Sequence, residues 1–254
     1  MKILLQNPNL HINKPFTVFE FNNFLNKENY DLLYNTFPSD KYFEKKELNE
    51  LRLKGTDYTH DRFSSIDPSF NNFLSENPLW KEFYESLNSE VFVRSAYFFS
   101  LIGCIKSRGL RALKIWTTKN KPFFIKKFFR KVKTSMVFSR QKGQQMVFPH
   151  TDNNKKLISM IYYLPEKSWK SDSKGGTEFW KNNQNIDRWK NASMIYESTF
   201  QDFKNDHTIF HTCKFEKNKL VGFVQSNISW HSVTNTKDTN QSRKSVGIFL
   251  RMDL

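Results

Sequence analysis

The sequence predicts a mainly β fold with flanking α-helices, and three observations lead to this fold class. About eight short segments of the second half are rich in Val, Ile, Phe and Tyr and are separated by turn residues such as Lys174-Gly175-Gly176. The first half shows helical patterns instead. The chain has 254 residues, an ordinary length for one β sandwich or barrel with a sizeable core. Short strands at this spacing are typical of a sandwich, a jelly roll or a barrel.

The first part of the chain is expected to hold a short strand followed by helices. Residues 16–21 are apolar on both faces of an extended segment, which favours a short strand that is covered on both sides. Asn26 can cap the helix that follows. The polar residues 39–67 are expected to form a loop. Residues 68–88 carry a helical pattern that Pro78 interrupts, so two short helices are expected there.

Two further segments of the first half are rich in phenylalanine. Residues 91–103 combine Phe with Val, and residues 122–132 combine Phe with Lys and Arg. A basic amphipathic stretch like the second can lie on an anionic membrane surface. A surface helix that packs its Phe side onto a sheet is the more common structure for such a pattern, and we favour that interpretation.

From residue 135 onward the apolar pattern changes to that of strands. The expected strands are residues 135–139, 146–149, 157–164, 177–180, 193–197, 220–224, 229–233 and 245–251. We therefore expect a single domain over 1–254, in which residues 135–254 form the β core. Residues 1–134 would be a helix-rich supporting region.

The net charge of +15 is distributed unevenly along the chain. No Asp or Glu occurs between Glu90 and Asp152, whereas Lys and Arg are frequent in that interval. A field of this sign attracts anions such as nucleic acid, lipid headgroups or an acidic small substrate. A solvated basic face is the alternative. No nucleic-acid-binding motif accompanies the charge, so nucleic acid is not the expected partner and an anionic substrate is preferred.

Cysteine content and hydropathy indicate the compartment. The two cysteines, Cys104 and Cys213, lie far apart and form neither a disulfide framework nor a zinc-ribbon pattern. The chain contains no run of 18 apolar residues, so no membrane span is predicted. The apolar run at the start is too short for a secretory signal. A cytoplasmic location without a membrane span is therefore expected.

A candidate metal site combines two segments that are distant in sequence. His150 and Asp152 lie at positions i and i+2, so on an extended segment their side chains point to the same side. A second imidazole, His231, follows about eighty positions later, on a strand that a β fold can bring alongside. Two histidines and one carboxylate are the ligand set of the facial triad, which holds non-haem Fe(II) and leaves positions open.

A candidate anion site opens the last expected strand. Arg243 and Ser245 place a guanidinium beside a hydroxyl, and the planar guanidinium suits bidentate pairing with a carboxylate. An iron site with a carboxylate clamp matches a cosubstrate that chelates the metal at one end and is anchored at the other. 2-Oxoglutarate has this chemistry.

The sequence resembles the Fe(II)/2-oxoglutarate-dependent oxygenases, in particular their prolyl-4-hydroxylase-like branch, over about residues 135–254. Five blocks agree with the family in order and spacing. They are Gly143 ahead of His150-Thr151-Asp152-Asn153, Ile161-Tyr162-Tyr163-Leu164, Gly175-Gly176-Thr177-Glu178-Phe179, His231-Ser232-Val233 and Arg243-Lys244-Ser245. The resemblance implies a double-stranded β-helix, that is, a cupin-like jelly-roll core with an N-terminal helical buttress. It also implies that residues 135–254 are the catalytic core and that residues 1–134 contribute to substrate specificity.

The resemblance also implies an activity and a set of site residues. The iron ligands would be His150, Asp152 and His231, and the contacts to 2-oxoglutarate would be Arg243, Ser245 and Tyr163. Such an enzyme uses Fe(II), 2-oxoglutarate and O2, with ascorbate as a further candidate cofactor. It would hydroxylate an unactivated C–H bond of an amino acid, a peptidyl residue or a small metabolite, and would convert 2-oxoglutarate to succinate and CO2.

One departure from the family argues against a prolyl substrate. Prolyl hydroxylases tend to carry a tyrosine about ten positions before the first ligand, and Arg140 lies near that place here. Arg140 could hold an acidic substrate or the cosubstrate, and an ordinary surface charge is the other interpretation. Residues 39–67 and 165–176 are candidates for a lid.

Several alternative interpretations remain open. His207 and His211, with Cys213 nearby, would share one face of a helix at a spacing that suits zinc, although we interpret them as a surface or loop feature. The four residues Trp169, Trp180, Trp189 and Trp230 could line a substrate pocket, but packing is the more common role. The main alternative function is a non-catalytic jelly-roll module that binds a metal or an anion. A nucleic-acid demethylase is a third hypothesis, motivated by the basic interval 91–151.

Overall fold

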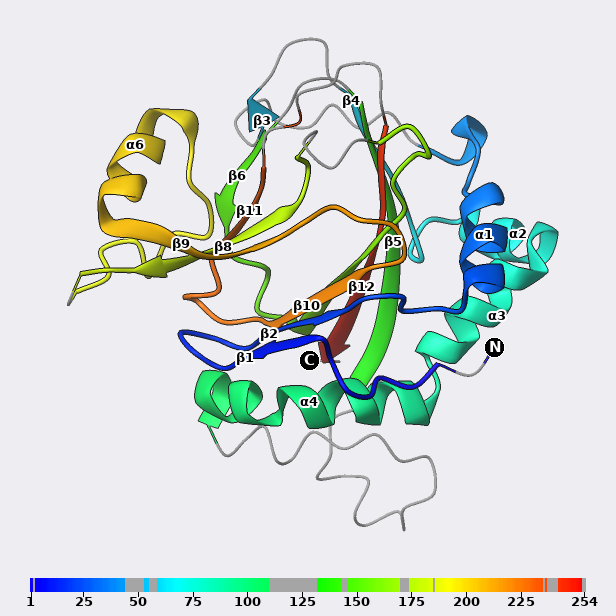
Figure 1. Cartoon of the computed structure of the whole chain (residues 1–254), viewed down its shortest axis with the longest axis horizontal. Coiled ribbons are helices and arrows are strands. Elements are labelled where there is room, and N and C mark those ends of the chain that lie inside the picture. The colour runs from blue at the N-terminus through cyan, green and yellow to red at the C-terminus, as the bar shows by residue number, and fades with distance from the viewer. Residues whose placement is uncertain are drawn as a thin grey trace.

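The computed structural model describes residues 1, 3–43, 53–54, 59–109, 132–142, 146–169, 174–184, 186–234, 236 and 242–252. Two antiparallel sheets form the core of this part of the chain (Figure 1). The larger sheet has seven strands, in the order β1 (Leu10–Ile12), β2 (Val18–Phe21), β10 (Leu220–Val224), β7 (Lys156–Tyr163), β12 (Arg243–Met252), β5 (Val132–Lys142) and β4 (Thr59–Ser64). The smaller sheet has five, in the order β3 (Leu53–Lys54), β6 (Met146–His150), β11 (His231–Val233), β8 (Thr177–Asn182) and β9 (His207–Cys213).

Helices flank the two sheets. They are α1 (Lys27–Asn35), the 3-10 turn η1 (Asp40–Tyr42), α2 (Phe70–Glu76), α3 (Pro78–Leu87), α4 (Glu90–Arg108) and α6 (Glu197–Asp206). In Figure 1, α1, α2 and α3 lie together beside the seven-stranded sheet, α4 runs below β1 and β2, and α6 lies at the opposite side, next to β9. The predicted mainly β jelly-roll core with flanking helices is confirmed.

The alternation of side chains along β7 separates two interiors. Ile158, Met160 and Tyr162 belong to the large apolar cluster that the N-terminal helices cover. Ile161 and Tyr163 point to the other face, where a second apolar cluster lies between the two sheets. Because successive side chains of a strand point to opposite faces, one strand supplies both interiors.

Local signals placed the first helices correctly. The side chain of Asn26 accepts a hydrogen bond of 2.8 Å from the backbone N–H of Asn29 and so caps α1. Pro78 is the first residue of α3, where its missing N–H costs nothing, and α2 ends two residues earlier. The two short helices expected over 68–88 are therefore confirmed.

Two expectations about secondary structure are wrong. Residues 59–64, expected as part of a loop, form β4, because they pair along β5 at the edge of the large sheet. The strand expected at 193–197 is reduced to a single bridge between Met194 and His150, and α6 begins at Glu197. Packing of Phe200 and Phe203 against Trp180 stabilises the helix there.

Other parts of the first half also differ from a purely helical support. Strands β1, β2 and β4 extend the large sheet, and β3 adds to the small one. Residues 91–103, for which no structure was predicted, form most of α4. The basic stretch 122–132 lies outside the described residues except for Val132, which opens β5. No described helix is long and apolar enough to cross a membrane.

Candidate functional site

The small sheet brings the two predicted histidines together. His150 is the last residue of β6 and His231 the first of β11, and the two are register partners in adjacent antiparallel strands. Asp152 follows two residues after the end of β6. One ligand atom from each of these three residues lies within 4.8 Å of the other two, which is the proximity that a shared metal ion requires. Among the described residues, this is the one such group of His, Cys, Asp and Glu side chains.

The hydrogen bonds of the two imidazoles orient them for coordination. His150 Nδ1 lies 3.0 Å from the carbonyl oxygen of Phe148, and His231 Nδ1 lies 3.1 Å from that of Ser229. A carbonyl only accepts, so Nδ1 carries the proton in both rings and Nε2 keeps its lone pair. Desolvation, together with the charge of His231, lowers the pKa of His150 to about 3, and desolvation also lowers the pKa of His231. Both rings are therefore neutral at neutral pH, as metal ligands must be.

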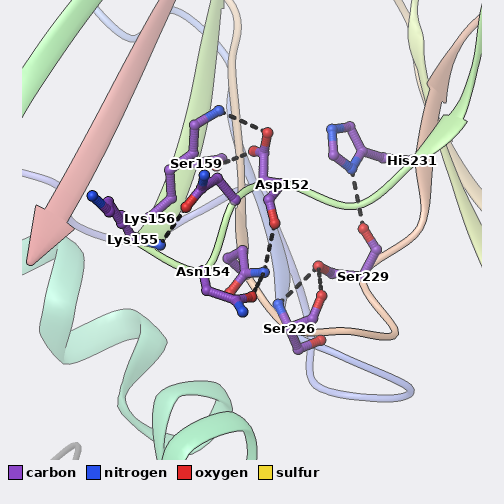
Figure 2. A network of polar contacts seen from close by, with 10 residues as sticks. Asp152, Asn154, Lys155, Lys156, Ser159, Ser226, Ser229 and His231 are labelled. Atoms are coloured by element: carbon purple, nitrogen blue, oxygen red, sulfur yellow. Dashed lines mark hydrogen bonds and ion pairs between the residues drawn. The ribbon is translucent and has the colours of Figure 1, made fainter. Parts of the chain in front are cut away.

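The carboxylate of Asp152 is held by two side chains from β7 (Figure 2). Lys156 Nζ donates to Oδ1 at 2.7 Å, and the hydroxyl of Ser159 donates to Oδ2. Burial by itself would raise the pKa of Asp152, but the positive charge of Lys156 and the two nearby imidazoles lower it well below its usual range. Asp152 is therefore anionic, and its carboxylate orientation is fixed.

A second group of contacts holds the backbone around Asp152. Gln225 Nε2 donates to the Asp152 carbonyl at 2.7 Å. Arg108, at the end of α4, donates through Nη2 to the carbonyl oxygens of Lys156 at 2.7 Å and Asn154 at 2.9 Å. Arg108 was predicted only as part of a basic interval, and no pattern in the sequence distinguishes Gln225. Sequence analysis therefore missed both of these supporting residues.

A polar chain also fixes the strand that carries His231. Ser232 donates to Glu178 Oε2 at 2.8 Å and accepts from Trp180 Nε1 at the same distance. Glu178 and Ser232 are register partners in β8 and β11. The side chains that alternate with His231 thus tie β11 to β8.

Arg243 lies at the predicted anion site and is buried, with 3% of its surface exposed. Its Nε donates to the Gly175 carbonyl at 2.6 Å, and Nη1 lies 3.2 Å from Gln141 Oε1 and 3.3 Å from Ser245 Oγ. Its Nη2 has no hydrogen-bond partner among the described residues. A buried guanidinium nitrogen without a partner costs free energy, so this arrangement fits a site that an anion completes.

The two neighbouring tyrosines of β7 point in opposite directions, as alternation requires. Tyr162 faces the helix-covered core and donates to Asn218 Oδ1 at 2.8 Å. Tyr163 packs on Phe215, lies with its ring 5.7 Å from the Arg243 guanidinium and shares a hydrogen bond of 2.6 Å with Thr177 Oγ1. Burial raises the pKa of Tyr163 well above its ordinary value, so this hydroxyl keeps its proton.

One cavity of about 950 Å³ joins the two predicted sites. His150, Asp152 and His231 line it, and so do Arg243 and Ser245. Tyr163 is not among the described lining residues, but its hydroxyl is hydrogen-bonded to Thr177, which is one of them. None of the four tryptophans considered as pocket residues belongs to the described lining, in agreement with a packing role. The cavity is large enough for a cosubstrate and a small substrate together.

The residues present fit the iron and the cosubstrate that the resemblance implies. Two neutral imidazoles and one carboxylate form a nitrogen and oxygen donor set that suits Fe(II). Arg243, whose Nη2 is unpartnered among the described residues, lines the same cavity, and a guanidinium suits a carboxylate.

Other candidate residues have structural partners away from this cavity. Arg140 pairs with Asp61 at 2.7 Å and with Asp40, and it is not part of the described cavity lining. His207 is buried and stacks on Phe203, which corrects the expectation of a surface or loop feature. His207 and His211 lie on strand β9 and not on a helix, because β9 pairs with β8.

His211 and the two cysteines also lie outside the described lining of the cavity. His211 Nε2 lies 2.5 Å from Glu20 Oε1. Cys213 and Cys104 are buried and free, and burial raises the pKa of the Cys104 thiol to about 12. These residues show no shared metal geometry in the described part of the chain.

Comparison with known proteins relates this site to a family. The family model described as the 2OG-Fe(II) oxygenase superfamily matches residues 136–251. The fold is similar to that of a prolyl-4-hydroxylase from Pseudomonas putida, with a TM-score of 0.52 and 11% identity over 94% of this chain and 94% of that chain. It is also similar to a prolyl 4-hydroxylase from Phytophthora capsici, with a TM-score of 0.50 and 11% identity over 92% of this chain and 58% of that chain. No curated protein sequence matches the chain.

Proposed function

We propose that this chain, whose residues 136–251 match the model of the 2OG-Fe(II) oxygenase superfamily, is an Fe(II)- and 2-oxoglutarate-dependent dioxygenase that hydroxylates an unactivated C–H bond. One observation carries the proposal: a buried arginine with an unpartnered nitrogen lines the same cavity as a His–Asp–His cluster. A module that only binds a metal has no need of a carboxylate anchor at the other end of its cavity. The substrate would be an amino acid, a peptidyl residue or a small metabolite.

Each of the three proposed metal ligands has a definite role in the proposed function. His150 and His231 present neutral Nε2 atoms, because their Nδ1 protons are used by backbone carbonyls. Asp152 presents an anionic oxygen, and Lys156 and Ser159 hold the carboxylate in place. When bound, the iron would activate O2 for the coupled oxidation of 2-oxoglutarate and of the substrate C–H bond.

The other end of the cavity would bind the cosubstrate. Arg243 Nη2 would donate to the distal carboxylate of 2-oxoglutarate, and Ser245, which lies against Nη1, would add a hydroxyl. Tyr163 would act by packing beside the guanidinium and fixing the local hydrogen bonds. The relatives of similar fold are prolyl hydroxylases, but the ion-paired Arg140 in place of a tyrosine supports a substrate other than peptidyl proline.

A spectroscopic titration tests this function. Fe(II) and 2-oxoglutarate are added to metal-free protein without oxygen, and a visible charge-transfer band of chelated iron is expected. Admission of O2 should then release succinate, even slowly without substrate. If no band forms while circular dichroism reports an intact fold, the oxygenase proposal fails, and the alternative of a metal- or anion-binding jelly roll replaces it.

A further inference from the structure

The lining of the cavity is strongly cationic. The charged side chains that line the cavity comprise one acid, Asp152, and the cations Arg62, Lys156, Lys190, Arg243 and Arg251. In the proposed function Arg243 binds 2-oxoglutarate and Asp152 binds the metal. The other charged groups of the lining all have the same sign, and a cleft lined by one sign of charge attracts the opposite charge.

Two of these cations, Lys156 on β7 and Arg251 on β12, lie away from Arg243, and we name them the distal basic cluster. Arg251 and Lys156 are register partners in adjacent strands. Arg251 lies eight residues after Arg243 on the same strand, which corresponds to about 27 Å of extended chain. The cluster is therefore separated along β12 from the Arg243 end of the cavity.

A β-bulge directs Lys156 into the cavity. Leu250 pairs with Ile158 but Arg251 pairs with Lys156, so Leu157 is an extra residue in β7. Leu157 and Ile158 consequently both enter the helix-covered core, where strict alternation would have sent Leu157 into the cavity. The same shift brings Lys156 to the cavity face, next to Asp152 and above the ring of Phe249 at 3.6 Å.

Lys156 and Arg251 are like charges at paired positions of adjacent strands, an arrangement that destabilises a sheet. No hydrogen bond or ion pair joins the side chain of Arg251 to any described residue. A carboxylate that binds a divalent metal is also a weaker partner for an ammonium, which leaves Lys156 available to a second anion.

We propose that the distal basic cluster anchors an anionic group of the substrate, a carboxylate or a phosphate, beside the metal site. This inference rests on the proposed oxygenase function. Arg251 supplies the planar fork of donors that both kinds of anion accept, and Lys156 supplies a point charge between that anion and Asp152. The cluster would thus fix the substrate at one end and leave its C–H bond facing the metal ligands.

Paired probes test the proposal directly. The protein is loaded with Mn(II) and saturated with 2-oxoglutarate under argon, so that Arg243 is occupied, and is titrated with benzoate, phenyl phosphate and the neutral analogue benzamide. Proton relaxation by Mn(II) reports binding close to the metal. At least one anion should bind about tenfold or more tightly than benzamide, and the tighter anion identifies carboxylate or phosphate as the preferred group.

Variants locate the site. Arg251→Gln should reduce the preference for the anion by about fivefold or more, and Arg251→Lys should retain most of it. The matched control is Arg94→Gln on α4, an exposed arginine paired with Glu90, which should behave as the unmodified protein. Equal relaxation of benzamide and the anions, or an unchanged preference in Arg251→Gln, overturns the inference while leaving the oxygenase proposal intact. Failure of the metal and 2-oxoglutarate to bind overturns both.

Discussion

The two ends of the cavity are built in opposite ways. At the metal-ligand end, both oxygens of Asp152 and both Nδ1 atoms of the histidines already have protein partners. At the Arg243 end, a buried cation has three partners that carry no negative charge and one nitrogen with none among the described residues. Protein contacts therefore fix the orientation of the side chains at the first end, whereas at the second end no described side chain balances the charge of Arg243.

This difference predicts how each end of the cavity should respond to mutation. Removing a metal ligand or its support should change metal affinity and leave the affinity of the guanidinium for a carboxylate unchanged. Removing the guanidinium should change cosubstrate affinity and leave the metal site intact. A substitution at one end that changed only the affinity of the other end would contradict this separation.

His231→Ala removes one of the three proposed metal ligands and should have the largest effect. Metal affinity should fall by more than the about 10- to 100-fold that is typical for loss of an outer partner. Titration calorimetry with Fe(II) or Mn(II) measures it. The control is His211→Ala, which removes a histidine hydrogen-bonded to Glu20 away from the cavity and should leave metal affinity unchanged. Equal metal affinity in both variants would remove His231 from the site.

Arg243→Gln should weaken the binding of 2-oxoglutarate by about 30-fold or more, because a desolvated carboxylate would lose its charged partner. The dissociation constant from the visible-band titration measures this effect at saturating Fe(II). Metal affinity without cosubstrate should stay within about twofold of the unmodified protein, since Arg243 contacts no metal ligand. A large loss of metal affinity with normal 2-oxoglutarate binding would reverse the assignment of the two ends.

Gln225→Leu should lower the affinity for the metal by about tenfold, the lower end of the range for supporting residues. The substitution removes the donor to the Asp152 carbonyl and so loosens the loop that carries this ligand. The same calorimetric titration applies, with Gln201→Leu on the exposed surface of α6 as the control. A loss of thermal stability without any change in metal affinity would make Gln225 a purely structural residue.

Tyr163→Phe should have the smallest effect, a loss of about fivefold in 2-oxoglutarate affinity for one hydrogen bond. Tyr162→Phe is a matched control, because it removes an equally buried hydroxyl bonded to Asn218 on the other face of the same strand. Both variants should lose a similar amount of thermal stability, but only Tyr163→Phe should weaken cosubstrate binding. An equal effect of the two on cosubstrate affinity would show that Tyr163 acts through stability alone.

Much of the fold and of the candidate site could be read from local signals. The short run of strand-forming residues at 157–164 predicted β7, and the proline at 78 predicted the break between α2 and α3. The spacing of His150 and Asp152 predicted that they share a side, and strand pairing then brought His231 opposite. Residues 59–64 and 193–197 were predicted wrongly, because pairing with β5 and packing of α6 outweigh local preference at those places.

The sequence by itself determined which chemical groups are present and which strand ends carry them: two imidazoles, one carboxylate and one arginine in family order. Only the tertiary structure decided what surrounds them. Gln225 and Arg108 hold the Asp152 loop, Arg140 is ion-paired away from the cavity, and a single extra residue in β7 directs Lys156 inward. These outcomes depend on contacts between segments distant in sequence and on strand register, and no local pattern encodes either.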